Sequence, residues 1–189
     1  MLKRIDQTLL EKENVTLKRD LEADYAALGE KLARSDVDIE RLTCAAGEFQ
    51  IAVPSWGTGT GGTRFARFPG EGEPRNIWEK LEDCAVINEL SGCTDSVSPH
   101  FPWDTVSDFS ELKEKADEYG IKWVSVNSNT FQDQVGQTAS YKYGSLSNTQ
   151  KASRELAIAH NLDCIEYGQK LGAKSLTVWV RPRCPLLDE

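Results

Sequence analysis

The N-terminal region carries leucines at regular intervals within an otherwise polar and charged sequence. Successive leucines lie seven, four, seven and four residues apart, which places them on one face of a helix: Leu10, Leu17, Leu21, Leu28 and Leu32. This stripe is too short and too irregular to require a coiled coil. Two interpretations follow: the helix packs on the body of the protein, or it forms a contact between subunits.

A short second helix is expected from Ser35 to about Gly47. Ser35 and Asp38 have the spacing of a capping box, and the glycine is a typical helix end. The apolar residues expected to face a core are Val37, Leu42 and Ala45. Residues 1–48 are therefore predicted to form a helical extension ahead of the main domain.

From Phe49 the chain alternates short apolar segments with amphipathic ones. Strands are predicted over 49–53, 96–101, 121–126 and 175–180, and helices over 76–90, 107–119 and 148–171. Because antiparallel neighbours need only hairpins, helical crossovers indicate parallel strands. The loops after the strands are long and those after the helices are short, which is typical of a barrel with its site at the carboxyl ends of the strands. A doubly wound sheet gives a similar spacing and stays open at this point.

Composition narrows the classes of function. The net charge of −8 disfavours nucleic-acid binding, since an acidic chain repels phosphate backbones. No apolar run approaches the roughly 20 residues of a membrane span, and the N-terminus has no apolar signal core. The five cysteines are odd in number and widely spaced, which indicates reduced thiols in a cytoplasmic protein. Cys84 and Cys164 are expected to be small buried hydrophobes.

Aromatic and polar residues gather at the predicted strand ends. They are Trp56, His100 with Trp103, Asn127 with Asn129, and Trp179. Aromatic rings beside a small polar cavity suit the C–H faces of a sugar, while histidine and asparagine can hydrogen-bond its hydroxyls. The alternative is that the tryptophans plug the mouth of the barrel as core. His100 is the candidate acid or base because imidazole titrates near neutrality, whereas His160, inside a predicted helix, is expected to be structural or on the surface.

The glycine-rich segment 57–62 invites a comparison with phosphate-binding loops. It lacks a Gly-Lys-Ser/Thr ending and runs into Thr63, Arg64 and Phe65, so no helix N-terminus is available to hold an anion. The same observation disfavours a Rossmann-type nucleotide binder. A mobile lid, or a loop that reaches a neighbouring subunit, is the better interpretation.

Five segments, in order between residues 49 and 180, together resemble the bacterial L-rhamnose isomerase/sugar isomerase family, which has a xylose-isomerase-like TIM barrel. They read VPSWG at 53–57, GGTRF at 61–65, HFPWD at 100–104, NSNTFQD at 127–133 and LTVW at 176–179. Any one of them alone would be a weak signal. Their shared order makes the resemblance specific.

The resemblance implies an aldose–ketose isomerase that acts on a monosaccharide with divalent metal ions, usually Mn²⁺, as a homotetramer. Trp56, Trp103 and Trp179 match positions that line the sugar pocket in this family. His100 matches a histidine that assists ring opening or holds the substrate. Phe65 matches a phenylalanine on a loop that covers the site of a neighbouring subunit.

Residues 49–180 hold about four β/α units, whereas a full barrel needs eight strands and about 250 residues. The resemblance therefore predicts an α/β fold that is the N-terminal half of a (β/α)8 TIM barrel. Residues 181–189 contain two prolines and depart from the family, so they are expected to be a divergent tail.

The family's metal ligands lie on later strands, and no metal ligand is expected among these residues. We expect a truncated sugar isomerase whose isolated chain lacks activity. The alternative is a non-catalytic sugar-binding or subunit-assembly module. The outer strands should have open edges, which favours dimerisation, aggregation or partial order.

Overall fold

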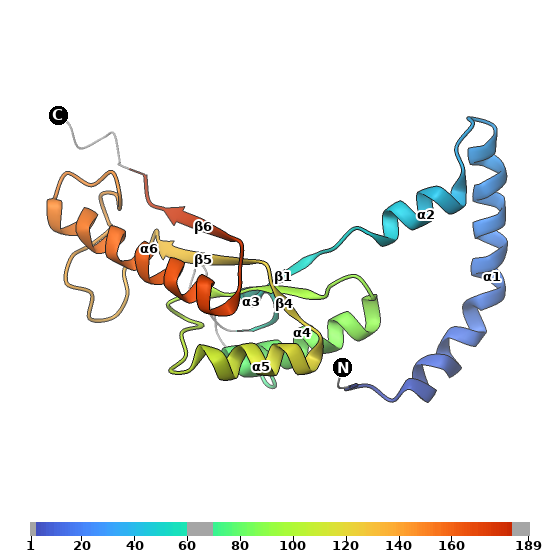
Figure 1. Cartoon of the computed structure of the whole chain (residues 1–189), viewed down its shortest axis with the longest axis horizontal. Helices are drawn as coiled ribbons and strands as arrows, with labels where there is room; N and C mark the ends of the chain where they lie inside the picture. The colour runs from blue at the N-terminus through green and yellow to red at the C-terminus, as the bar shows by residue number, and fades with distance from the viewer. Residues whose placement is uncertain (1–2, 60–69, 183–189) are drawn as a thin grey trace.

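The computed structural model describes residues 3–59 and 70–182 of the 189-residue chain (Figure 1). The helices in these ranges are α1 (Gln7–Ala33), α2 (Ile39–Gly47), α3 (Ser55–Thr58), α4 (Ile77–Ser91), α5 (Phe109–Tyr119) and α6 (Lys151–Leu171). The strands are β1 (Ala52–Pro54), β2 (Ser96–Ser98), β3 (His100–Phe101), β4 (Lys122–Trp123), β5 (Ser125–Thr130) and β6 (Ser175–Val180). Every strand pair is parallel, so the predicted α/β class is confirmed.

The strands form two short sheets that continue into one another. One sheet has the order β1–β2–β4 and the other the order β3–β5–β6. Only Pro99 separates β2 from β3, and only Val124 separates β4 from β5, so each of these pairs is one strand with a break. The four resulting strands lie side by side in chain order. A doubly wound sheet reverses its order at a switch point, and the described strands contain no such reversal. They also do not close into a barrel.

The hydrophobic core lies between these strands and helices α4, α5 and α6. Its fully buried members come from all of these elements and include Leu81, Cys84, Val97, Leu112, Ala116, Val126 and Cys164. The prediction that Cys84 and Cys164 are buried is confirmed. Gly168 lets α6 approach β5 closely, because a Cβ there would lie 3.1 Å from Cγ2 of Val126. The helices therefore hold the strands, and with them the strand ends, in fixed positions.

Glycines and short polar residues set the helix ends. Gly92, Gly120 and Gly172 follow α4, α5 and α6 with φ of 70°, 71° and 79°, a left-handed conformation that favours glycine. Asn76 and Asp108 accept backbone N–H groups at the starts of α4 and α5. These ends agree with the predicted helices to within about two residues, whereas α6 begins three residues later than predicted.

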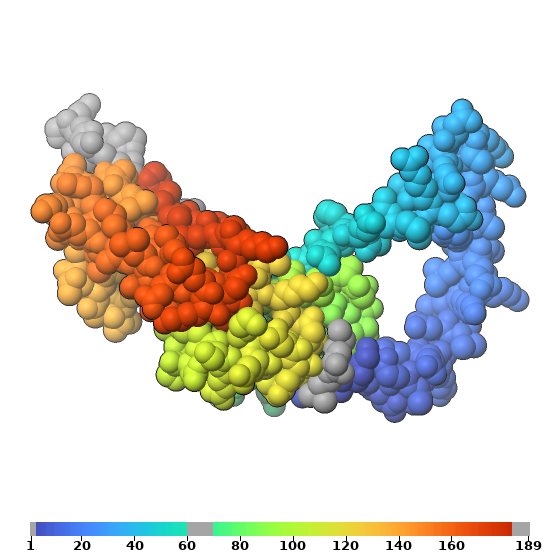
Figure 2. Space-filling view, in the orientation of Figure 1, coloured from blue at the N-terminus to red at the C-terminus, as the bar shows by residue number. Residues whose placement is uncertain are grey.

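Helices α1 and α2 form an arm that stands away from the sheet (Figures 1 and 2). Neither helix contains a buried residue. The arm contacts the body where the backbone N–H groups of Arg4 and Ile5 donate to Glu89 on α4. Its two helices meet through Tyr25 Oη and Thr43 Oγ1, 2.9 Å apart. The interpretation of α1 as packed on the body is therefore wrong, and the subunit contact stays a prediction.

The local boundaries around the arm also differ from those expected. α2 begins after Asp38, whose carboxylate accepts the Arg41 N–H at 3.0 Å, and does not begin at Ser35. The residues expected to face a core are exposed because α2 lies in the arm: Val37, Leu42 and Ala45. The strand expected over 49–53 is shorter and shifted to β1. The start of the glycine-rich loop is one helical turn, α3.

Both outer strands have open edges. Among the described residues, β1 pairs only with β2 and β6 only with β5, as predicted. Val178, Trp179 and Val180 of β6 are more than a third exposed. Whether these edges lead to dimers or aggregates stays a prediction. None of the described helices is long and apolar enough to cross a lipid bilayer.

Candidate functional site

Four aromatic side chains surround His100 at the carboxyl ends of the strands, and we call them the aromatic cage. Trp103 and Trp56 lie closest, with ring centroids 4.8 Å and 5.0 Å from the imidazole, both in edge-to-face geometry. Phe131 and Trp179 lie at 6.2 Å and 6.3 Å. Each member follows or ends a different strand, so the parallel sheet brings together residues more than a hundred positions apart. The three predicted tryptophans and His100 therefore do meet.

His100 is buried and chemically unsatisfied. It is 3 % exposed, and neither ring nitrogen has a hydrogen-bond partner among the described residues. Burial lowers its pKa to about 4, against an opposing influence of the Asp104 carboxylate. The imidazole is therefore neutral at pH 7, with one nitrogen able to donate and the other to accept.

The two ring nitrogens of His100, unpaired in the described part of the chain, argue against the alternative that these side chains only pack as hydrophobic core. A buried polar atom without a partner costs about 1–3 kcal/mol, and native proteins contain few of them. An apolar side chain at position 100 would fill the cage without this cost. Trp179 is 44 % exposed, so one wall of the cage reaches the surface. The arrangement is suited to an apolar-faced ligand with hydroxyl groups.

Asn127 fixes the orientation of Trp179. Its Oδ1 accepts the indole N–H of Trp179 at 3.1 Å, while its Nδ2 donates to the carbonyl of Pro99 at 3.1 Å. Asn129 binds the adjacent loop, because its Nδ2 donates to the Gln132 carbonyl at 3.0 Å. Both asparagines lie within β5 and not after a strand. Their amides bind protein groups, so the expectation that they face sugar hydroxyls is not supported.

Phe131 was not among the predicted cage residues. It directly follows β5, and its backbone N–H donates to Asn129 Oδ1 at 3.4 Å. The sequence signal was its position immediately after a polar strand end. The other predicted aromatic residue, Phe65, falls outside the described residues, as does the glycine-rich segment from residue 60.

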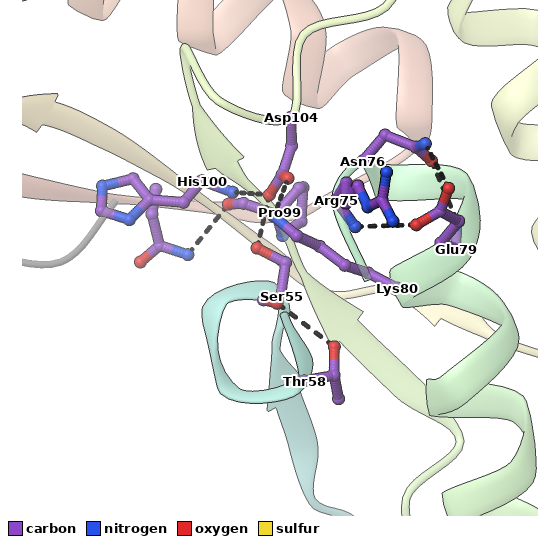
Figure 3. A network of polar contacts seen from close by, with 10 residues as sticks. Ser55, Thr58, Arg75, Asn76, Glu79, Lys80, Pro99, His100 and Asp104 are labelled. Atoms are coloured by element: carbon purple, nitrogen blue, oxygen red, sulfur yellow. Dashed lines mark hydrogen bonds and ion pairs between the residues drawn. The ribbon is translucent and has the colours of Figure 1, made fainter. Parts of the chain in front are cut away.

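A buried polar network adjoins His100 (Figure 3). Lys80 Nζ of α4 lies 2.7 Å from Asp104 Oδ1, and both side chains are fully buried. The second oxygen of Asp104 accepts the His100 backbone N–H at 2.7 Å and the Ser55 hydroxyl. One carboxylate thus joins three separate segments of the chain. The sequence signal was Lys80 itself, a charge on the face of α4 that carries Ile77, Leu81 and Cys84.

The described residues do not fit a divalent metal ion. No group of three or more histidine, cysteine, aspartate or glutamate side chains comes together in ranges 3–59 and 70–182. The two aspartates near the strand ends are already engaged. Asp104 binds Lys80, and Asp133 accepts from Ser140 and from the backbone N–H of Tyr141 at 2.6 Å.

Three further reactive side chains, those of His160, Cys84 and Cys164, are partly or fully buried. His160 on α6 is partly buried, with its Nε2 3.5 Å from Cys164 Sγ. Burial lowers its pKa and raises the pKa of Cys84 and of Cys164 to about 12. These thiols stay protonated at neutral pH and are poor nucleophiles.

Comparison with known proteins adds to this geometry. No protein-family profile matches the chain. A probable sugar isomerase of Rhizobium meliloti is 54% identical over 176 residues, which cover 93% of this chain and 41% of that protein. A probable sugar isomerase of Mesorhizobium japonicum is 51% identical over 176 residues, with the same coverage. The chain is homologous to part of both of these probable sugar isomerases.

The chain spans about two fifths of the length of the curated relatives it matches. The matching 176 residues cover most of the chain, so they extend beyond the cage itself. The names of both relatives state a general activity, that of a sugar isomerase, and specify no particular sugar. The similarity is therefore to proteins of a general class and points to no particular substrate.

Proposed function

We propose that this chain forms the sugar-binding wall of an aldose–ketose isomerase that resembles L-rhamnose isomerase. The observation that carries the proposal is a neutral, buried His100 with two unpaired ring nitrogens inside an aromatic cage. The homology to probable sugar isomerases supports the same class. We infer that the four strands are the first half of a (β/α)8 barrel, an inference that their parallel pairing in chain order supports.

The aromatic cage and His100 have different roles in this proposal. Trp56, Trp103 and Trp179 contact the C–H faces of the monosaccharide, where an apolar ring surface excludes water. His100 hydrogen-bonds sugar hydroxyls as donor at one nitrogen and acceptor at the other. Because its pKa is about 4, we favour a holding role during ring opening over a charged acid.

The metal and the assembly rest on the family resemblance. We propose that the whole protein uses Mn²⁺ or a related divalent ion, held by residues outside the described part of this chain. We also propose a homotetramer in which Phe65 reaches a neighbouring subunit's site. On this view the isolated chain binds sugar weakly and does not turn it over.

A titration with L-rhamnose and D-allose, followed by tryptophan fluorescence, tests the proposal. We expect a saturable change that Trp103→Phe and His100→Gln abolish. Trp78→Phe is the matched control, because Trp78 lies on α4, packs against the core and is not one of the four cage residues. An equal loss in Trp78→Phe, or no saturable change for any monosaccharide, would contradict the sugar-binding role. An assay for ketose formation with Mn²⁺ should give no product, and turnover would refute the proposed lack of activity.

A subunit-assembly module is the second candidate, and the exposed stripe of α1 favours it. Leu17, Leu21 and Leu28 are 58%, 63% and 48% exposed. If α1 joins subunits, Leu21→Glu should lower the mass measured by light scattering. Ala23→Glu, which adds the same charge on the opposite face of α1, should not. An unchanged mass in both variants would exclude this role for the stripe.

A further inference from the structure

Asp104 lies where the segments that carry two walls of the aromatic cage meet. Its carboxylate binds Ser55, the residue before Trp56, and the backbone N–H of His100. The Asp104 N–H in turn donates to the His100 carbonyl at 3.1 Å, which closes the turn that carries Trp103. Figure 3 shows the carboxylate between these segments, with Lys80 reaching it from α4.

The ion pair at this place is hard to explain by stability alone. Both Lys80 and Asp104 are fully buried, and removing two charges from water costs several kcal/mol per ion in order of magnitude. A well-packed apolar pair would serve the core as well or better. What an apolar pair cannot do is accept hydrogen bonds from the Ser55 hydroxyl of α3 and from the His100 backbone N–H of β3.

The geometry points to Asp104 as a positioning residue that holds the Ser55–Trp56 turn against the His100–Trp103 turn, so that the Trp56 ring lies on the His100 imidazole. This inference deepens the proposed function, because the residues held are those proposed to contact the sugar. Lys80 balances the charge of the carboxylate and directs one of its oxygens. The hydrogen bonds of the Asp104 carboxylate go to Ser55, to the His100 backbone and to Lys80, so it positions the cage through these neighbours.

Loss of the hydrogen bond between Ser55 and Asp104 should weaken the contact between Trp56 and His100. Trp56 belongs to α3, a single helical turn at the end of the edge strand β1, which pairs on one side only among the described strands. The Ser55 hydroxyl links this turn directly to the Asp104 carboxylate. If the turn moves outward, water reaches the imidazole and its desolvation decreases.

Ser55→Ala is the test, because it removes the hydroxyl and changes no charge near His100. The groups whose charge acts on the imidazole are Asp104, Lys80 and His160, and all of them remain. The chain has only two histidines, so ring signals of ¹³C-labelled histidine are assigned with one further variant, His160→Gln. We expect the pKa of His100 to rise from about 4 toward 6.5. The nuclear Overhauser contacts between the imidazole and the Trp56 indole should weaken.

Ser153→Ala is the matched control. Ser153 is as fully buried as Ser55, and its hydroxyl donates one hydrogen bond, to the Ser140 carbonyl at 2.9 Å. This variant loses a comparable interaction on α6 and should leave His100 unchanged. Ser55→Thr, which keeps the hydroxyl, should restore the contact that Ser55→Ala loses.

Three results would overturn the inference. They are an unchanged His100 titration in Ser55→Ala, an equal change in Ser153→Ala, and absent imidazole–Trp56 contacts in the unmodified chain. The last measurement stands even if Ser55→Ala does not fold. Sugar titration separates this inference from the proposed function. A chain that binds no sugar but loses the contact in Ser55→Ala refutes only the proposed function, and one that binds sugar with the contact unchanged refutes only the positioning role.

Discussion

Replacing Lys80 by methionine removes one half of the buried ion pair and keeps an unbranched side chain that is one atom shorter. In the unmodified protein Nζ lies 2.7 Å from Asp104 Oδ1, and the two side chains are 2% and 0% exposed. The variant leaves a carboxylate in the core with only the Ser55 hydroxyl and the His100 N–H as partners. Breaking a buried pair in this way costs about 3–5 kcal/mol, and we expect the free energy of unfolding to fall by that amount.

A double-mutant cycle isolates the pair. Asp104→Asn alone leaves the Lys80 ammonium unpaired and should also be strongly destabilising. In Lys80→Met with Asp104→Asn no charge is buried, and the amide still accepts the His100 N–H. The double variant should therefore lose much less than the sum of the single losses, with a coupling of about 3 kcal/mol. Lys113→Met is the control, since Lys113 and Asp117 form an exposed pair on α5 worth about 0.5 kcal/mol or less.

Urea denaturation followed by circular dichroism measures these differences, with an osmolyte added to every sample if the single variants are largely unfolded. A loss below about 1 kcal/mol in Lys80→Met would mean that the pair behaves as a solvated surface pair. Additive single losses would mean that the two side chains do not act on each other. Either result would refute the buried network.

Three further outcomes are expected. The pKa of His100 is lowered from 6.5 to about 4 in the folded state, so the unfolded chain binds the proton more readily. The free energy of unfolding should therefore fall as the pH drops from about 6.5 to about 4. In urea titrations, His100→Gln should lack this part of the pH dependence. Cys44 is exposed and should react promptly with Ellman's reagent, whereas Cys84 and Cys164, with pKa raised to about 12 by burial, should react only on unfolding. Leu81→Ala should cost about 2–5 kcal/mol in denaturation, because this side chain is fully buried among α4, α5 and the sheet; a loss below about 1 kcal/mol would contradict the assigned core.

Local signals predicted the regular part of the fold well. Gly92, Gly120 and Gly172 sit in left-handed conformations that few other residues adopt, so they marked the helix ends correctly. The strand over 175–180 was predicted at its observed limits. Contacts between segments far apart in the sequence were harder to predict from local patterns. Whether α1 packs on the sheet depends on surfaces far away in sequence, and its leucine stripe is the same in either case.

The sequence predicted which residues form the site, but it did not predict the hydrogen bonds that hold them in place. Trp56, His100, Trp103 and Trp179 all lie near strand ends, and parallel strands bring such ends together. Asn127 looked like a ligand-binding residue because its partner, the Trp179 indole, lies 52 positions away. Buried hydrogen bonds of this kind depend on register, which sequence spacing alone does not fix.

The two open edges also restrict how copies of this chain can associate. A twofold axis that passes through the β6 edge would place β6 beside β6 of the second copy, and the two strands would then run antiparallel. A parallel continuation instead joins β6 to β1 of the next copy, which is a head-to-tail contact. Such contacts form a ring if the rotation closes and a filament if it does not. With four strands in each chain, a ring of two copies would contain eight parallel strands. The sheet's curvature therefore decides between a discrete dimer and open-ended polymerisation.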